Sequence, residues 1–223
     1  MNPPVITVDG PSASGKGTIA RRLAEALGFH CLDSGALYRL VALRSLRENV
    51  PADDAQALAE LAEDLPARFA GENIFLEDQD VTVDLASEAC GSRASEVAKL
   101  PQVREALLER QRAFRRPPGL VADGRDMGSV VFPDAALKVF LTASAAVRAE
   151  RRYKQLKQKG IRATVATLFR ELEARDARDA ARAVSPLVPA PDAVQVDSSD
   201  LTIDEVVSRI LGWWRERADG VHA

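Results

Sequence analysis

The sequence decides its fold between residues 5 and 27, which read VITVDGPSASGKGTIARRLAEAL. The β-branched run at residues 5–8 is typical of a strand that is covered on both faces. Behind it, apolar residues recur at the spacing of one helix face, at Ile19, Leu23, Ala26 and Leu27. A loop with the pattern G-x-x-x-x-G-K joins the two elements, and this strand–loop–helix context predicts a phosphate-binding loop.

The chemistry of this loop suits a di- or triphosphate. Backbone N–H groups of the loop and of the helix start converge on anionic oxygens, and Lys16 adds a point charge. The alternative is a glycine-rich turn that only begins a helix. We expect the phosphates to be held by the whole loop: Gly10, Pro11, Ser12, Ala13, Ser14, Gly15, Lys16, Gly17 and Thr18.

One detail of the loop narrows the class of enzyme. Gly17 follows the lysine directly, and the hydroxyl is carried by Thr18. The form G-K-G-T resembles nucleoside monophosphate kinases more than GTPases or motor ATPases.

Composition argues against several other classes of protein. The 223 residues carry a formal net charge of −3, so no global positive field attracts nucleic acid or a membrane surface. Cys31 and Cys90 stand far apart, which suits a reducing cytoplasm rather than a disulfide framework. The two histidines, His30 and His222, do not suggest a metal site. We expect no signal peptide and no membrane span, and therefore a cytoplasmic protein. We also expect it to be a monomer.

The remaining chain alternates strands and helices, as an α/β protein does. Apolar runs predict four further core strands, at residues 29–32, 120–122, 137–141 and 193–196. We expect a helix to begin at Ser34, which can cap it, and its free N–H groups to form a second anion site near Arg39. Later helices are expected to be capped by Ser144 and by a box of Thr202 and Glu205.

Between these elements the pattern changes to that of an inserted lobe. Short strand-like pieces predict an antiparallel meander, at residues 67–69, 73–76 and 81–83. A surface helix is expected at residues 51–65, and another helix starts at Pro101 with Arg104 off its apolar stripe. That stripe consists of Val103, Leu107 and Phe114. Such a lobe most often borders a ligand cleft.

Charged residues follow directly after the predicted strand at residues 120–122, at its carboxyl end. Asp123, Arg125 and Asp126 follow it, and ligands of open α/β sheets bind where strands end. Asp123 also fits a Walker-B-like acid. The alternative is a polar turn with its charges in water, because Asp-Gly is an ordinary turn pair.

A basic stretch follows the strand at residues 137–141. Its arginines at i, i+3 and i+4 share one helix face, and its lysines extend it: Arg148, Arg151, Arg152, Lys154, Lys157 and Lys159. This face is either solvated or part of a mobile lid that closes over polyphosphate.

In the next helix an apolar seam turns ionic. The spacing of Leu168 and Leu172 continues into Arg175, Asp179 and Arg182. Burying such groups without partners costs several kcal/mol each, so we expect them in a solvated cleft that a polar ligand enters. The alternative is an ion pair between Arg175 and Asp179.

Five segments together resemble one family, the bacterial cytidylate kinases. They are GPSASGKGT at 10–18, LDSGALYR at 32–39, ASEVAKLPQVREAL at 94–107, ADGRDMGSVVFPDA at 122–135, and the RDARDAAR run with SPL at 175–187. This family transfers the γ-phosphoryl group of ATP, with Mg²⁺, to CMP or dCMP. The resemblance implies a P-loop NTPase-type three-layer α/β sandwich with a five-stranded parallel sheet, an antiparallel β lobe and a helical lid.

The resemblance also divides the single domain of residues 1–223. The core would comprise residues 1–62, 100–147 and 168–223, with an acceptor-binding insert at about 63–99 and a lid at about 148–167. Mg²⁺ would be held mainly by nucleotide and water, near Thr18 and Asp123, without a direct protein ligand.

Roles of single residues follow by matching position. ATP would be bound by residues 10–18 and Arg148. The acceptor would be bound by Ser34, Gly35, Tyr38, Arg39, Ser95, Arg104, Arg125, Asp126, Arg175 and Asp179. Of these, Ser95, Arg104 and Asp126 would read the cytosine. The catalytic cations would be Lys16, Arg125, Arg152 and Arg182.

Two positions depart from the family pattern. Ala13 replaces a glycine that is common in this loop, which is expected to stiffen the loop. Ala86 stands where an arginine is expected before Ser87, and this departure affects acceptor binding.

The expected reaction needs no general base, because a nucleoside monophosphate is already largely a dianion near neutral pH. Arginines from several segments supply the charge neutralisation that it does need. Two alternatives remain. One is a small-metabolite kinase of shikimate-kinase type with Asp33 or Asp126 as base, and the other is a P-loop ATPase or switch module without an acceptor.

Overall fold

The computed structural model describes residues 2–71, 73–158, 160–182 and 184–220, without the side chains of 218–220. Lys159 and His222 lie outside the described residues. Contacts divide the chain into two compact units, which we call the sheet unit (residues 1–32 and 114–223) and the helical unit (residues 33–113). The predicted boundaries of core, insert and lid stay a prediction.

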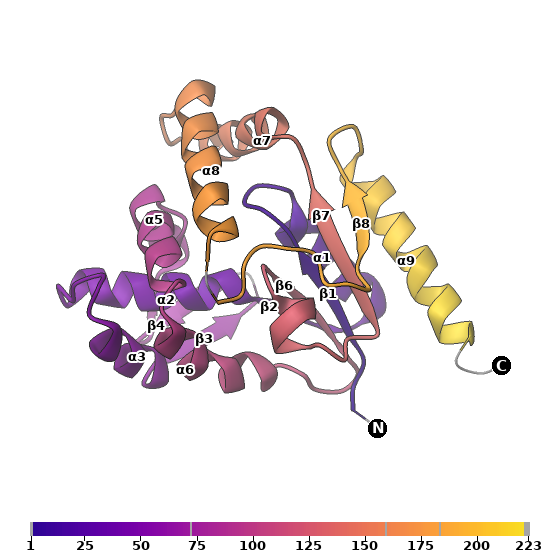
Figure 1. Ribbon diagram of the computed structural model, residues 1–223, viewed down its shortest axis with the longest axis horizontal. Helices are drawn as coiled ribbons and strands as arrows, with labels where there is room; N and C mark the ends of the chain where they lie inside the picture. Colours follow the sequence, from indigo (N-terminus) through magenta and orange to yellow (C-terminus); the bar gives the residue numbers. More distant parts are fainter. Residues whose placement is uncertain (1, 72, 159, 183, 221–223) are drawn as a thin grey trace. The chain divides into compact units, whose positions relative to one another are not determined.

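The main element of the sheet unit is a five-stranded parallel sheet with the strand order β2-β6-β1-β7-β8 (Figure 1). Its strands are β1 (Val5–Asp9), β2 (His30–Asp33), β6 (Leu120–Gly124), β7 (Leu137–Thr142) and β8 (Val194–Asp197). β1 lies between β6 and β7, so that Asp9 is beside Gly124 on one side and Phe140 on the other. The predicted α/β fold with a five-stranded parallel sheet is confirmed.

Helices of the sheet unit pack on this sheet or follow its strands. They are α1 (Lys16–Leu27), the short π-helix η1 (Met127–Val131), α7 (Ala145–Gln158), α8 (Val165–Ala180) and α9 (Ile203–Gly220). α1 and α9 share one apolar core with the strands, in which Ile6, Leu23 and Ile210 are among the fully buried residues. The caps at Ser144 and at Thr202 with Glu205 form as predicted.

Two expectations for this unit are wrong in detail. β2 is an edge strand, and only Leu32 of its four residues is buried, so it is not the buried strand that its apolar run predicts. In α1, Ala26 is exposed and Ala24 is buried instead. The core-facing stripe is therefore centred on Ala20, Leu23 and Ala24 rather than on the C-terminal turn.

The helical unit contains five helices among its described residues and a small antiparallel sheet, β3-β4-β5. The helices are α2 (Ser34–Arg47), α3 (Ala55–Glu63), α4 (Thr82–Leu85), α5 (Glu88–Val97) and α6 (Pro101–Arg112). The strands are β3 (Ala67–Ala70), β4 (Asn73–Leu76) and β5 (Gln79–Asp80). The predicted antiparallel lobe is thus confirmed, although α5 was not expected.

The last strand of the lobe is shorter and earlier than predicted. Strand β5 ends at Asp80, whose carboxylate accepts a hydrogen bond from the Thr82 N–H, and residues 82–85 turn into α4. The Thr82 hydroxyl in turn accepts from the Ile74 N–H. These two side-chain bonds end the ladder where the apolar alternation alone predicts a strand at 81–83.

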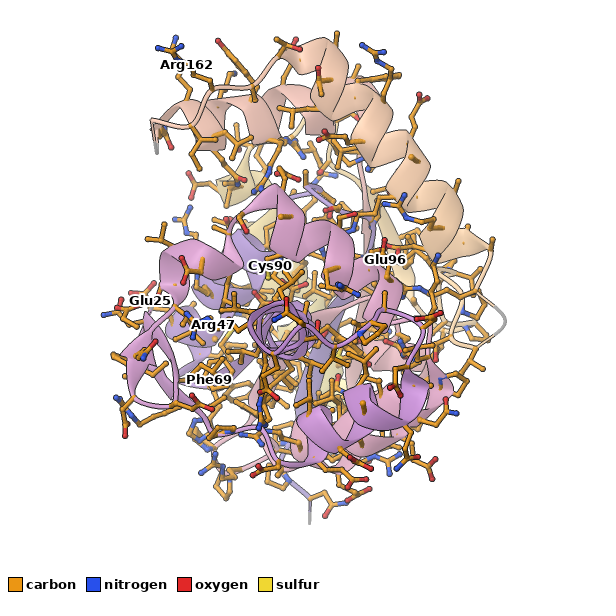
Figure 2. All side chains as sticks on the ribbon, turned by 90° about the vertical axis from the view of Figure 1, so that its left-hand side faces the viewer. Glu25, Arg47, Phe69, Cys90, Glu96 and Arg162 are labelled. Atoms are coloured by element: carbon orange, nitrogen blue, oxygen red, sulfur yellow. The ribbon has the colours of Figure 1, made fainter. Side chains whose placement is uncertain are left out.

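The start of α2 also differs from expectation. Asp33 is the N-cap, and its carboxylate accepts a hydrogen bond from the Ala36 N–H at 3.2 Å. Ser34 is the first helical residue and is buried. Cys90 of α5 packs against this helix, where its thiol donates to the Arg39 carbonyl (Figure 2).

No helix within the described ranges has both the length and the apolarity needed to cross a bilayer.

The burial of α1 gives a stability prediction for the sheet unit. Leu23 is fully buried and Leu27 only partly. We expect Leu23→Ala to lower the free energy of unfolding by about 3 kcal/mol and Leu27→Ala by about 1 kcal/mol, because the cost follows the cavity left behind. Urea titration followed by tryptophan fluorescence measures this, since both tryptophans, Trp213 and Trp214, lie in α9 of the same unit. Equal losses in the two variants would contradict the packing.

Candidate functional site

The phosphate-binding loop leaves the carboxyl end of β1, and its shape requires glycine at two positions. Gly10 adopts a φ of 153°, and a Cβ there would lie 2.1 Å from the Leu141 carbonyl oxygen. Gly15 has a φ of 96° at the N-cap of α1, a conformation that side chains disfavour. The first residues of α1 therefore follow directly on a loop with the predicted form.

Lys16 lies at the centre of this loop and is buried. Its ammonium group donates to the Pro11 carbonyl at 3.3 Å and lies 3.8 Å from a carboxylate oxygen of Asp123. The other oxygen of Asp123 would lie 3.0 Å from a Cβ at position 17. Gly17 thus leaves room for the acid, which gives the G-K-G-T form a physical reason. Asp123 itself is buried rather than in water.

Ala13 occupies a left-handed conformation, with a φ of 59°. This conformation costs an L-residue about 1–2 kcal/mol, so a glycine would fit it without strain. The Ala13 side chain packs against an apolar cluster of α7 and α8 that includes Leu156, Leu168 and Leu172. The departure from glycine therefore places a methyl group between the loop and these two helices.

Two arginines of α7 bind carbonyl groups of the loop. Arg148 donates to the Ser12 carbonyl at 3.1 Å and pairs with Asp176 of α8 at 2.5 Å. Arg151 donates to the Ser14 carbonyl at 3.0 Å. Arg148 is buried and Arg151 and Arg152 are half-buried, whereas Lys154 and Lys157 of the same basic stretch are exposed. Arg162 between α7 and α8 is exposed as well (Figure 2).

The C-terminal end of α8 carries a buried carboxylate surrounded by arginines. Asp179 is fully buried, accepts a hydrogen bond from the Arg125 Nε at 3.1 Å and pairs with Arg182. Burial raises the pKa of Asp179, but the charges of Arg125, Arg182 and Arg175 outweigh it and hold the pKa below its ordinary value. The expectation of a solvated cleft is therefore wrong for Asp179, and its charge is neutralised by more residues than the i,i+4 pair with Arg175.

Asp9 lies beside the loop but is not among the residues predicted from the sequence, where it marks only the end of a strand. It is buried, and its two oxygens accept hydrogen bonds of 2.8 Å from the N–H groups of Met127 and Gly128. Burial raises the pKa of Asp9 to about 6 although these N–H groups lower it; Asp126 raises it and Arg125 lowers it. Its position between a buried strand and a phosphate loop is the signal that could have identified it.

Beside the loop, the sheet unit contains a cavity of about 350 Å³. It is lined by the loop and α1, by α7, and by the segment between β8 and α9, with Thr18, Gln155, Ser198, Leu201 and Val206 among its residues. Its volume lies in the range of small-molecule sites, roughly 300–1,000 Å³. The lining also includes Ala13, Ser14 and Gly15 of the predicted phosphate loop, whereas Gln155, Ser198 and Leu201 were not predicted as site residues.

In the helical unit, the predicted acceptor residues lie on α2, α5 and α6. Arg39 donates to the carbonyls of Leu85 and Ser87, on both sides of Ala86. Arg104 is buried, donates to the Ala98 carbonyl at 3.1 Å, and places its guanidinium 5.6 Å from the Tyr38 ring centroid. Arg104, which the spacing places off the apolar stripe of α6, is thus buried as well, and its acceptor role stays a prediction.

Three more acceptor candidates complete this unit. Ser34 and Ser95 are buried, and Gly35 is exposed at the start of α2. A Cβ on Gly35 would lie 3.1 Å from a carboxylate oxygen of Asp33, the cap of the helix. A side chain at position 35 would therefore crowd the capping carboxylate, which gives a physical reason for glycine there.

Comparisons with known proteins show the family of this chain. The family model described as Cytidylate kinase matches residues 6–216. A protein of Ralstonia pickettii named Cytidylate kinase is 60% identical over 96% of this chain and 92% of its own length. One of Bordetella bronchiseptica with the same name is 58% identical over 95% of each chain. A solved gluconokinase of Sinorhizobium meliloti covers 99% of this chain and 96% of its own at 20% identity, with a TM-score of 0.49. From the family match and the two relatives, we conclude that this chain belongs to the cytidylate kinase family.

Proposed function

We propose that the protein transfers the γ-phosphoryl group of ATP to CMP or dCMP, giving ADP and CDP or dCDP. The observation that carries this proposal is the buried Lys16, held between its own loop and Asp123 at the carboxyl end of β1, in a chain of this family. Such a lysine is a fixed positive charge for a polyphosphate.

ATP binds through two adjoining features of the sheet unit. The N–H groups of the loop and Lys16 bind the phosphates. The base enters the cavity beside the loop, where Ile19, Leu201 and Val206 offer apolar surface and Ser198 and Gln155 offer polar groups. Arg148 and Arg151 act on the donor through the loop carbonyls that they bind.

CMP or dCMP is the phosphate acceptor. In the sheet unit, Arg125, Asp126, Arg175, Asp179 and Arg182 serve it and the transferred phosphoryl group. In the helical unit, the corresponding residues are Ser34, Gly35, Tyr38, Arg39, Ser95 and Arg104. These roles rest on the resemblance of the motifs, and the fixed arginine–carboxylate pairs around Asp179 support them.

The transfer step needs no proton acceptor on the protein. The phosphate of the acceptor is largely a dianion near neutral pH and attacks the γ-phosphorus directly. Lys16, Arg125, Arg152 and Arg182 neutralise charge on the transferred group, and cations already fixed in the folded state do so without reorganisation. The alternative, a shikimate-type kinase, would need Asp33 or Asp126 as a base. Asp33 instead accepts a hydrogen bond as the cap of α2, and Asp126 is buried, so neither position favours that alternative.

Mg²⁺ fits the residues near the loop. Asp123 and Thr18 provide hard oxygen groups, which suit an ion held mainly by phosphate oxygens and water. Within the described residues, no cluster of three or more His, Cys, Asp or Glu side chains could hold a metal by itself. When bound with ATP, the ion reduces the negative charge of the β- and γ-phosphates.

Removing the lysine tests the donor site. We expect Lys16→Ala to lower kcat by at least about 10²-fold, because one fixed charge on the transferred group is lost. Arg21→Ala is the matched control, since Arg21 is an exposed cation on the same helix. A coupled ADP-release assay with ATP and CMP measures both variants. A Lys16→Ala enzyme with near-normal kcat would refute the assigned role.

Base selection tests the acceptor. We expect kcat/KM for CMP and dCMP to exceed that for UMP by at least about 10²-fold, because a buried polar site rejects a base that leaves its groups unpaired. The same assay with CMP, dCMP, UMP, AMP and shikimate measures this. Equal values for UMP and CMP would contradict the proposal, and activity on shikimate alone would favour the metabolite-kinase alternative.

A further inference from the structure

A buried carboxylate links the start of the phosphate loop to a second segment of the sheet unit. Asp9 is the last residue of β1 and directly precedes Gly10 of the loop. Both of its oxygens bind backbone N–H groups at the start of η1, one to Met127 and one to Gly128. The link between the two segments therefore consists of one side chain and two backbone N–H groups.

The segment that Asp9 holds also fits closely against β1. A Cβ at Gly128 would lie 2.7 Å from the hydroxyl oxygen of Thr7 and 3.1 Å from the Lys138 Cδ. Glycine therefore lets the backbone of η1 lie directly on the strand. Asp9 and Gly128 together fix the height and the register of this segment on β1.

What this segment carries is the pair Arg125 and Asp126. They are the two residues before η1, and Arg125 extends to the buried Asp179. A displacement of the backbone at residues 127–128 must move both side chains, because only one or two peptide units separate them. Asp9 thus acts on these two residues through the backbone of residues 127 and 128.

Burying an ionised carboxylate lowers the stability of the fold, so two hydrogen bonds to the backbone alone are a weak reason to have one at this position. Burial penalises its charge, and neighbouring Asp126 adds repulsion. A neutral asparagine would fill the same space with a smaller desolvation penalty. Its amide nitrogen is a donor, however, so it could not accept an N–H at both of the positions where the two Asp9 oxygens accept one each. The use of a carboxylate here is explained if both bonds matter for activity.

We propose that Asp9 is a positioning residue for phosphoryl transfer, which holds Arg125 and Asp126 in register with the phosphate loop through the N–H groups of Met127 and Gly128. The inference rests on the proposed roles of Arg125 and Asp126 in acceptor binding. It predicts that loss of the carboxylate raises KM for CMP and lowers kcat, while KM for ATP is unchanged.

The proposal also predicts a dependence on pH. A protonated Asp9 carries an O–H on one oxygen and can no longer accept both N–H bonds, and its pKa is raised by burial to about 6. The charged groups that act on it are Asp126 and Arg125, which follow β6. On the strands paired with β1, Asp123 is beside Val8 and is paired with Lys16, and Lys138 is beside Thr7 and is paired with Asp192. Activity should therefore fall as the pH drops through about 6.

The test compares the wild type with Asp9→Asn between pH 5 and pH 8.5. The phosphate of CMP also titrates with a pKa of about 6. We therefore divide kcat/KM for CMP of the wild type by that of Asp9→Asn at each pH, because the effect of substrate ionisation cancels in this ratio. We expect a ratio of about 10 to 10² at pH 8, because small misplacements cost that much. It should decline toward one as the pH falls to 5. Asp53→Asn, an exposed aspartate, is the control.

A ratio near one at pH 8, or a ratio that does not change with pH, would overturn the inference. If Asp9→Asn does not fold, Gly128→Ala decides, because its Cβ pushes the same segment away from Thr7. It should raise KM for CMP and leave ATP binding intact, and unchanged kinetics would overturn the inference.

Arg125→Ala separates this inference from the proposed function. If Arg125→Ala leaves KM for CMP and kcat unchanged, the proposed role of Arg125 fails. If Arg125→Ala impairs both while Asp9→Asn and Gly128→Ala do not, the role of Arg125 stands and the positioning role of Asp9 fails.

Discussion

The parallel pairing of β1 between β6 and β7 is the constraint on which the charged groups of the sheet unit depend. It places Asp9 beside Gly124, so the phosphate loop, Asp123 and the segment at residues 125–128 all lie at the carboxyl end of the parallel strands. The charged groups buried in this unit are tolerated because each has a partner. Lys16 meets Asp123, Asp9 meets two N–H groups, and Asp179 meets Arg125 and Arg182.

These pairs explain how a chain with a net charge of −3 provides a site for polyanions. The protein has no general positive field that would attract a polyanion. Instead, single cationic side chains are fixed in place by carboxylates and carbonyls of the fold. Arg148 and Arg151 bind two carbonyls of the loop, and the Ala13 methyl packs between them against α7 and α8. The loop is therefore fixed from two directions, by the sheet through its strand and by α7.

Local patterns in the sequence predicted the elements that depend on local physics. The strands, the G-K-G-T loop, the caps at Ser144 and Thr202, and the antiparallel lobe follow from turn chemistry and apolar spacing. Features set by tertiary contacts were missed. Nothing near β2 indicates that it lies at the edge of the sheet, and no local pattern shows that Asp9 binds N–H groups 118 and 119 residues away. Likewise, the burial of Asp179 depends on Arg125, which is 54 residues distant.

The central claim is that this site transfers phosphate to a nucleotide rather than to water. Incubating the protein with ATP labelled on the γ-phosphate, with and without CMP, tests it most directly. We expect the label to move to CDP when CMP is present and to stay on ATP when CMP is absent. If the label is released as inorganic phosphate at the same rate with and without CMP, the nucleotide is not the phosphate acceptor.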